Sequence, residues 1–139
     1  MKQFKTYSHR ETKKLAEDLS YKITKGVIAL TGELGAGKTT FVQGFAKGLG
    51  IKDKIISPTF VLIRQHKFPG EKKILYHIDL YRLEGDINIR HLGIEEIMSN
   101  PDNLVLIEWA EKIEKSLSKK TIKINLQKIS ENERLISLS

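Results

Sequence analysis

The sequence contains no cysteine, so disulfides, thiolate metal sites and cysteine nucleophiles are all excluded. No apolar run approaches the roughly 20 residues needed to cross a bilayer, and the first residues, MKQFKTYSHRETKK, lack the apolar core of a secretory signal. We therefore expect a soluble, cytoplasmic protein with no membrane partner. No repeat, low-complexity segment or linker interrupts the chain, and its 139 residues fit a single domain, residues 1–139.

Long lysine runs are also missing, although the formal net charge is +7. Residues 1–31 carry seven Lys or Arg against three acids, residues 47–74 carry seven against two, and residues 75–99 carry two against five. A basic surface of this kind fits nucleic acid or an acidic partner. Because no lysine run exceeds two and no aromatic-rich strand accompanies the lysines, we favour a lysine-rich composition that keeps the protein in solution.

Residues 32–39 form a complete phosphate-binding loop (P-loop, or Walker A motif), Gly-x-x-x-x-Gly-Lys-Thr. The apolar run before it predicts a strand at about 27–31, and the segment after it predicts a helix at about 38–48. The glycines let successive backbone N–H groups turn toward phosphate oxygens, and the helix adds its positive end. Lys38 is expected to reach the β- and γ-phosphates, and the Thr39 hydroxyl to ligate Mg²⁺.

The rest of the chain alternates between helix and strand patterns. Ser8-His9-Arg10-Glu11 has the form of a capping box and begins a predicted helix. A Pro-Gly turn separates two strand-like runs, which predict a hairpin. The apolar run Leu104-Val105-Leu106-Ile107 is typical of a strand buried on both faces. The predicted elements outside the P-loop are a helix at about 9–22, strands at 59–66 and 73–80, a helix at 90–98, a strand at 104–108 and a terminal hairpin of 121–128 and 133–138.

This pattern predicts an α/β fold, namely a single-domain P-loop NTPase with a mostly parallel central sheet, antiparallel hairpin additions and flanking helices. Strands 27–31 and 104–108 should be parallel neighbours or nearly so, because both must deliver their carboxyl ends to one phosphate site.

Two carboxylates follow apolar strands and are placed to face the P-loop magnesium. Asp79 ends the predicted strand at 73–80, and Glu108 ends the strand at 104–108. Enzymes with a P-loop place a strand-end carboxylate on Mg²⁺, directly or through water. Having two candidates leaves their roles open, and for each the alternative is an ordinary exposed acid at a strand end.

Three further residues have two interpretations each. Thr59 follows a rigid Ser-Pro step and is either a switch-loop hydroxyl that senses the γ-phosphate or the start of a strand. His77 shares a strand face with Asp79 and either orients it or is a structural histidine, which we favour. Trp109 adjoins Glu108 and either packs over the nucleotide, faces a partner or anchors the core.

Taken together, the motifs GELGAGKTT, SPTF, HIDLYRL and LIEWAEK, in this order and spacing over residues 32–112, resemble the bacterial TsaE family. Its members are small P-loop ATPases of tRNA threonylcarbamoyladenosine (t6A) biosynthesis. The resemblance implies an ATPase, weak alone, that acts with the TsaD and TsaB proteins and meets tRNA indirectly through their complex. The sequence after about residue 115 is too generic to bear on the match.

The resemblance also assigns residues. It implies ATP and Mg²⁺ as cofactors, Thr39 and Glu108 as metal ligands, and Asp79 as a catalytic or water-positioning acid beside Lys38. Thr59 would lie in a switch-like loop, Trp109 would flank the site, and Arg134 would approach the nucleotide. The residues implied to hold the phosphates are Gly32, Glu33, Leu34, Gly35, Ala36, Gly37, Lys38, Thr39 and Thr40.

Other classes of P-loop protein share part of this pattern. A GTP switch protein usually carries an Asn-Lys-x-Asp segment and an Asp-x-x-Gly after a strand, and neither occurs. A small-molecule kinase usually needs an Arg-rich lid, whereas the five arginines here are scattered, at 10, 64, 82, 90 and 134. A stand-alone NTPase and a non-catalytic, nucleotide-dependent binding module both remain alternatives.

Overall fold

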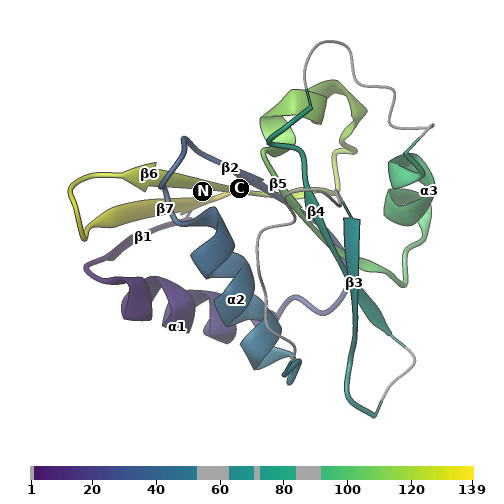
Figure 1. Ribbon diagram of the computed structural model, residues 1–139, viewed down its shortest axis with the longest axis horizontal. Helices are drawn as coiled ribbons and strands as arrows, with labels where there is room; N and C mark the ends of the chain where they lie inside the picture. The colour runs from purple at the N-terminus through teal and green to yellow at the C-terminus, as the bar shows by residue number, and fades with distance from the viewer. Residues whose placement is uncertain (1, 53–62, 71–72, 84–91) are drawn as a thin grey trace.

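The computed structural model describes residues 2–52, 63–70, 73–83 and 92–139. Its centre is one mixed sheet of seven strands in the order β1-β7-β6-β2-β5-β4-β3 (Figure 1). The strands are β1 (Lys2–Thr6), β2 (Gly26–Thr31), β3 (Ile63–Lys67), β4 (Ile74–Asp79), β5 (Leu104–Glu108), β6 (Ile122–Lys128) and β7 (Arg134–Leu138).

The middle of the sheet is parallel and its two edges are antiparallel. β2 lies between β5 and β6 and is parallel to both, and β4 is parallel to β5. Antiparallel pairing joins β3 to β4 at one edge, and joins β6 to β7 and β7 to β1 at the other. The predicted fold class and the parallel pairing of strands 27–31 and 104–108 are confirmed, as are both predicted hairpins.

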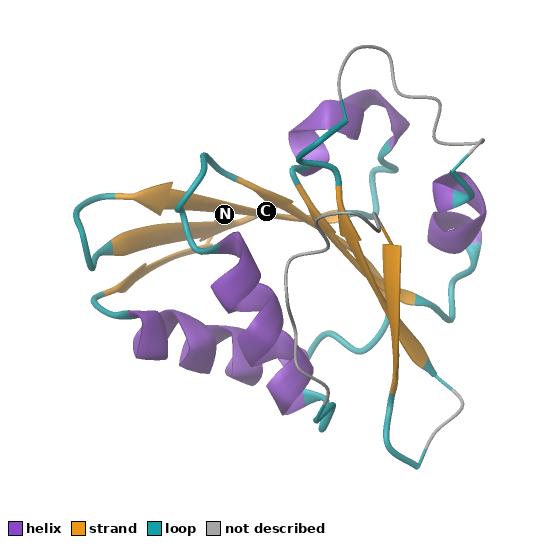
Figure 2. Cartoon of the chain, viewed as in Figure 1, coloured by secondary structure: helices purple, strands orange, loops and turns teal. Residues whose placement is uncertain are grey.

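Helices cover both faces of this sheet, giving three layers (Figure 2). One face carries α1 (His9–Ser20) and α2 (Lys38–Gly48), whereas the other carries α3 (Ile94–Ser99) and the 3₁₀ segment η1 (Ala110–Ser116). Within the described residues, no helix is long and apolar enough to cross a membrane.

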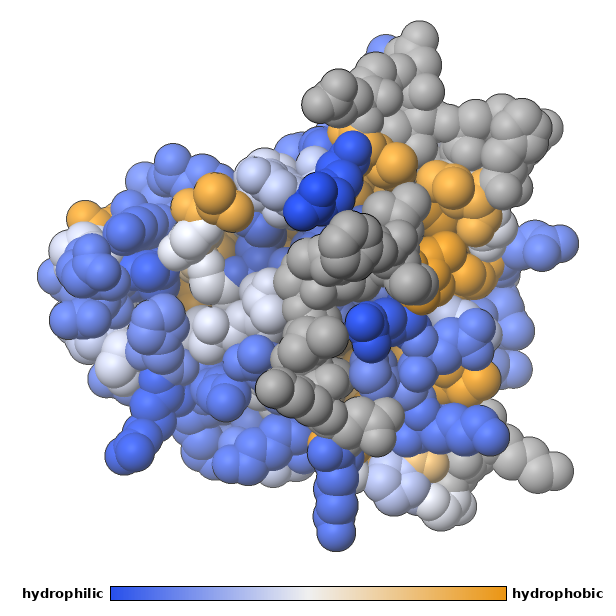
Figure 3. Space-filling view, in the orientation of Figure 1, coloured by the Kyte–Doolittle hydropathy of each residue, from blue (hydrophilic) through white to orange (hydrophobic). Residues whose placement is uncertain are grey.

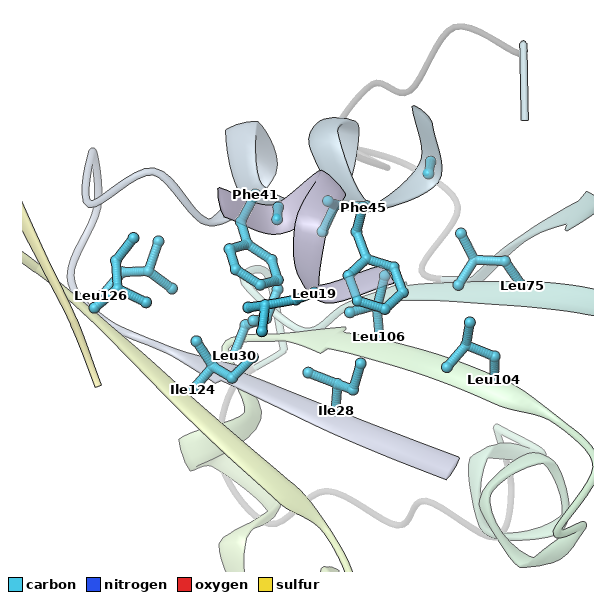
Figure 4. Close-up of a cluster of buried hydrophobic side chains, with 14 of the residues drawn as sticks. Leu19, Ile28, Leu30, Phe41, Phe45, Leu75, Leu104, Leu106, Ile124 and Leu126 are labelled. Carbon is cyan, nitrogen blue, oxygen red and sulfur yellow. The ribbon is translucent and has the colours of Figure 1, made fainter. Parts of the chain in front are cut away.

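The core under α2 packs the helix after the P-loop against the strand before it. Phe41 and Phe45 are fully buried, with ring centroids 6.2 Å apart, and they lie over Ile28 and Leu30 of β2 (Figure 4). Burying a large apolar side chain contributes roughly 1.5–3 kcal/mol. The strand before the P-loop and the helix after it are therefore clamped together on either side of the loop.

Most predicted boundaries lie close to those observed, with two differences in the helices and one missed strand. The helix predicted at 9–22 ends at Ser20, and the helix predicted at 90–98 begins at Ile94, after Gly93 with φ +76°. Residues 59–62 and 90–91 of the predicted elements lie outside the described residues. The edge strand β1 was not predicted, because its charged sequence KQFKT gains its pairing only from β7 at the far end of the chain.

The predicted N-terminal cap of α1 is present with one change. The Ser8 side chain accepts a hydrogen bond from the Glu11 N–H at 3.1 Å, as a capping box requires. Glu11 Oε1 accepts in return from the Tyr7 N–H at 3.3 Å, rather than from that of Ser8. The start of α1 is thus fixed next to the P-loop, where Thr12 lies 4.0 Å from a Cβ built on Gly37.

Gly44 lets α1 and α2 approach at backbone distance, which leads to a stability prediction. A Cβ at this position would lie 2.2 Å from the carbonyl oxygen of Lys13. We expect Gly44→Ala to lower the free energy of unfolding by about 1–3 kcal/mol, because a helix backbone must move. Urea unfolding followed by circular dichroism measures it.

The control is Lys47→Ala, an exposed position one turn further along α2. It should leave stability within about 0.5 kcal/mol. A Gly44→Ala variant as stable as the Lys47→Ala variant would contradict this account of the helix packing.

Candidate nucleotide site

The P-loop follows β2 directly and surrounds the start of α2. Gly35 and Gly37 have φ values of +82° and +101°, in the left-handed region that other L-residues rarely adopt. Gly37 is the N-cap of α2 and has no capping side chain, so the first N–H groups of an eleven-residue helix are left for another acceptor. An anion is the natural acceptor at this position.

Lys38 lies inside the loop, with only 5% of its surface exposed. Its Nζ donates to the carbonyl oxygens of Gly32 and of Glu33, the latter at 2.9 Å. Burial lowers the pKa of the Lys38 ammonium, and nearby carboxylates, led by that of Glu111, oppose part of this effect. A bound phosphate would therefore stabilise this partly desolvated cation, because its negative charge would compensate for the lost hydration.

Glu108 connects the P-loop helix to the sheet. Its Oε1 accepts a hydrogen bond from the Thr39 hydroxyl at 2.9 Å, and its Oε2 lies 2.5 Å from Nε2 of His77. Thr39 belongs to α2 and His77 to β4, and the side chains of His77 and Glu108 are at most 3% exposed. Glu108 is thus fixed in one orientation from two sides.

Asp79 pairs in register with Glu108 across β4 and β5, so the two carboxylates share the carboxyl edge of the sheet. Only 4% of Asp79 is exposed, and its Oδ1 accepts from the Tyr81 N–H at 2.9 Å. The hypothesis that His77 orients Asp79 is not supported, because the hydrogen bond of His77 is made to Glu108 instead.

A cavity of about 360 Å³ opens where these elements meet. It contains most of the predicted site residues, together with three that the sequence did not single out: His9, Tyr81 and Arg82. Its lining residues are His9, Leu34, Gly35, Gly37, Lys38, Thr39, Thr40, Asp79, Tyr81, Arg82, Glu108 and Trp109.

Trp109 forms one wall of the cavity in a strained backbone conformation. Its φ is +60°, which is uncommon for a residue other than glycine and costs on the order of 1–3 kcal/mol. The centroid of its ring lies 4.0 Å from Nζ of Lys38 and 5.1 Å from the ring centroid of Tyr81. The strained turn directs the indole toward the P-loop lysine, where it packs beside the phosphate-binding group.

Two residues just after Trp109, Glu111 and Lys112, hold its segment against neighbouring loops and were not predicted. Glu111 Oε2 accepts from the Gly32 N–H at 3.3 Å, which ties η1 to the beginning of the P-loop. Lys112 Nζ donates to the carbonyl oxygens of Tyr81 and Leu83, both at 2.6 Å. These contacts join the segment that follows β5 to the segments that follow β2 and β4. In the sequence, both residues belong to the LIEWAEK motif, which does not indicate these contacts.

The other predicted binding residues occupy different positions. Gly32, Glu33 and Ala36 belong to the loop without lining the cavity, and Thr59 lies outside the described residues. Arg134 of β7 reaches the outer side of the loop, where its Nη2 donates to the Gly35 carbonyl at 3.0 Å. Its Nη1 donates to three carbonyl oxygens of the β6–β7 turn, so the contacts of this guanidinium are with backbone groups.

The oxygen atoms of Thr39 and Glu108 would suit Mg²⁺ better than a metal that takes all its ligands from the protein. Mg²⁺ takes one or two protein oxygens and fills its octahedron with water and phosphate oxygens. Thr39 and Glu108 supply such oxygens side by side, with Asp79 on the next strand. Among the described residues, no group of three or more His, Cys, Asp or Glu could hold a metal by itself.

Comparison with known proteins agrees with this geometry. The family model described as "Threonylcarbamoyl adenosine biosynthesis protein TsaE" matches residues 6–136. The chain belongs to the TsaE family. A TsaE protein of Rickettsia felis is 41% identical over 94% of this chain and 75% of its own length. The TsaE protein of Bacillus subtilis is 38% identical over 100% of this chain and 87% of its own length.

A solved structure extends the TsaE likeness to three dimensions. The crystal structure of Bacillus subtilis YdiB superposes with a TM-score of 0.78 at 33% identity, and covers 99% of this chain and 83% of the YdiB chain. The predicted membership of the TsaE family is confirmed, and this family is named for the biosynthesis of t6A in tRNA.

Proposed function

We propose that this TsaE-family chain is a Mg²⁺-dependent ATPase subunit that acts in the cytoplasm with TsaD and TsaB. Together they would form the threonylcarbamoyl group on adenosine 37 of tRNAs. The observation that supports ATP chemistry most strongly is the contact of Thr39 with Glu108 at 2.9 Å, beside the buried ammonium of Lys38. A phosphate-binding loop, a hydroxyl and a fixed carboxylate are the parts that phosphoryl transfer needs.

The residues divide the work as follows. Backbone N–H groups of the P-loop and the Lys38 ammonium would bind the phosphates, and Thr39 and Glu108 would hold Mg²⁺. The ion, when bound, neutralises charge on the phosphate oxygens. Asp79 lies one strand away from Glu108 and would accept a hydrogen bond from the attacking water, while Trp109 keeps bulk water from one side of the cavity.

Glu108 and Asp79 should separate when each is replaced by alanine. We expect Glu108→Ala to weaken binding of ATP with Mg²⁺ far more than binding without it, because a ligand oxygen is lost. Asp79→Ala should raise the activation barrier of hydrolysis by about 2–4 kcal/mol and leave nucleotide binding nearly unchanged. Nucleotide titrations with and without Mg²⁺, beside phosphate release, measure both. Equal effects of the two variants on binding and on rate would refute the division.

His77 should act on the site through Glu108. Replacing it with leucine removes the hydrogen bond to Glu108 Oε2, and we expect Mg²⁺-dependent nucleotide affinity to fall about 10–100-fold, as when an outer partner of a metal ligand is lost. His77→Gln places an amide N–H close to the position of Nε2 and should restore most of that affinity. Titration of the nucleotide at several Mg²⁺ concentrations measures the effect.

The matched control is His66→Leu, which removes another buried histidine, on β3. Its register partner is Leu75, well before the carboxyl edge of β4. If His66→Leu and His77→Leu change the Mg²⁺ dependence of nucleotide affinity equally, both act by destabilising the fold. The proposal that His77 positions Glu108 then fails.

A further inference from the structure

A second hollow, of about 480 Å³, lies beside the nucleotide cavity along α1 and α2. It is lined by one acid, Glu17, one histidine, His9, and four cations, namely Arg10, Lys13, Lys14 and Lys47. His9 also lines the nucleotide cavity, so the two hollows adjoin at the start of α1. The outer surface of these two helices, at the lower left of Figure 3, is predominantly hydrophilic.

The positive charge in this hollow is largely unneutralised. Within the part of the chain that the structure describes, Arg10, Lys13 and Lys47 make no ion pair. Lys14 pairs with Asp18 at 3.3 Å, but both side chains are more than half exposed, and an exposed pair of this kind contributes little. The hydrogen bond to Asp18 raises the pKa of Lys14, which as an exposed lysine is charged at neutral pH in any case. Four Lys or Arg side chains against one lining acid, Glu17, favour an anionic occupant.

We propose that this basic hollow docks an acidic surface of a protein partner, and the proposal rests on the function proposed above. A nucleic acid is the less suitable occupant. α1 carries as many acids as Lys and Arg together, with Glu11, Glu17 and Asp18 among Arg10, Lys13 and Lys14. A phosphate backbone, with one charge per 3.4 Å of strand, would meet those acids. A protein surface can place its own charges to match a mixed pattern.

Exposed tyrosines at the two ends of α1 support a protein interface. Tyr7, just before the helix, is 55% exposed, and Tyr21, just after it, is 61% exposed. Tyrosine is enriched at protein interfaces because it provides a large rigid contact area and a polar group. A partner seated here would also lie against His9, at the side of the nucleotide cavity, and so would be able to sense or change its state.

Reversal of charge in the hollow tests the docking. The variant Lys13→Glu/Lys47→Glu should bind a purified TsaD–TsaB complex about tenfold more weakly than the unchanged protein, with a smaller dependence on salt. The control, Lys119→Glu/Lys120→Glu, changes charge equally at an exposed turn before β6 and should stay within about twofold. Circular dichroism and ATP affinity of the isolated variants show that fold and nucleotide site persist.

The outcomes separate this inference from the proposed function. If the unchanged protein binds the complex and both double variants bind equally well, the hollow is not the docking surface, although the partnership stands. If the unchanged protein does not bind, the partnership fails, and the docking with it. If the isolated protein binds labelled tRNA, and Lys13→Glu/Lys47→Glu abolishes that binding but not binding to TsaD–TsaB, the occupant is RNA and the proposal is overturned.

Discussion

Lys38→Ala should lower ATP turnover by at least two to three orders of magnitude, the effect of losing about 3–4 kcal/mol of stabilisation at the transferring phosphate. Lys38 is the cation buried within the P-loop, and its resting partners are two backbone carbonyls of that loop. Phosphate release under saturating ATP and Mg²⁺, combined with nucleotide titration, measures the loss.

The fold should survive this substitution. Lys38 contributes charge rather than apolar packing. Gly32 is half-buried and Glu33 is exposed, so we expect water to replace the ammonium at their carbonyl oxygens. Lys120→Ala, in an exposed turn, is the matched control and should retain full turnover. A Lys38→Ala protein that is folded and hydrolyses ATP at the normal rate would show that the P-loop does not carry the chemistry.

TsaD and TsaB, added together, should raise turnover by up to about 10³–10⁵-fold, the range that an arginine supplied in trans can provide. Arg134 is held by four backbone carbonyls behind the P-loop. Within the described residues, Arg82 is the arginine that lines the cavity. A partner would either supply further positive charge or act on the switch-like loop that the family resemblance implies around Thr59, which lies outside the described residues.

Phosphate release by the protein alone, with each partner and with both distinguishes these cases. GTP in place of ATP tests the GTP switch rival in the same assay. If the lone protein already matches the mixture, and Arg82→Ala removes that activity, the arginine acts in cis and a stand-alone NTPase becomes the better description.

Short sequence patterns were enough to predict the elements at the centre of the fold. The P-loop helix begins and ends where its sequence predicts, because Gly37 permits the turn into it and Gly50, with φ +82°, follows its end. β5 was recognisable because its four apolar residues are buried on both faces of a parallel sheet. Strand-end position then brought Glu108 to Thr39, as the topology requires.

Contacts between distant segments were not predictable in the same way. Alternation correctly placed His77 and Asp79 on one face, but it says nothing about the neighbouring strand, and Glu108 of β5 proved to be the partner of His77. Glu111 meets Gly32 only because η1 turns back over the carboxyl end of β2. His9 reaches the cavity because Gly44 allows α1 to lie against α2, a fact of packing that no local pattern contains.

The most direct test of the account is t6A formation in a reconstituted mixture of tRNA, threonylcarbamoyl donor, TsaD, TsaB and ATP, followed over many turnovers. The TsaE resemblance implies that ATP hydrolysis by this subunit resets the complex between turnovers. We therefore predict that t6A accumulates with the unchanged protein, and that its formation stops after about one turnover when the protein is omitted or carries Lys38→Ala. Equal t6A formation with the unchanged and the Lys38→Ala proteins would contradict the central claim that ATP hydrolysis at this P-loop sustains the modification.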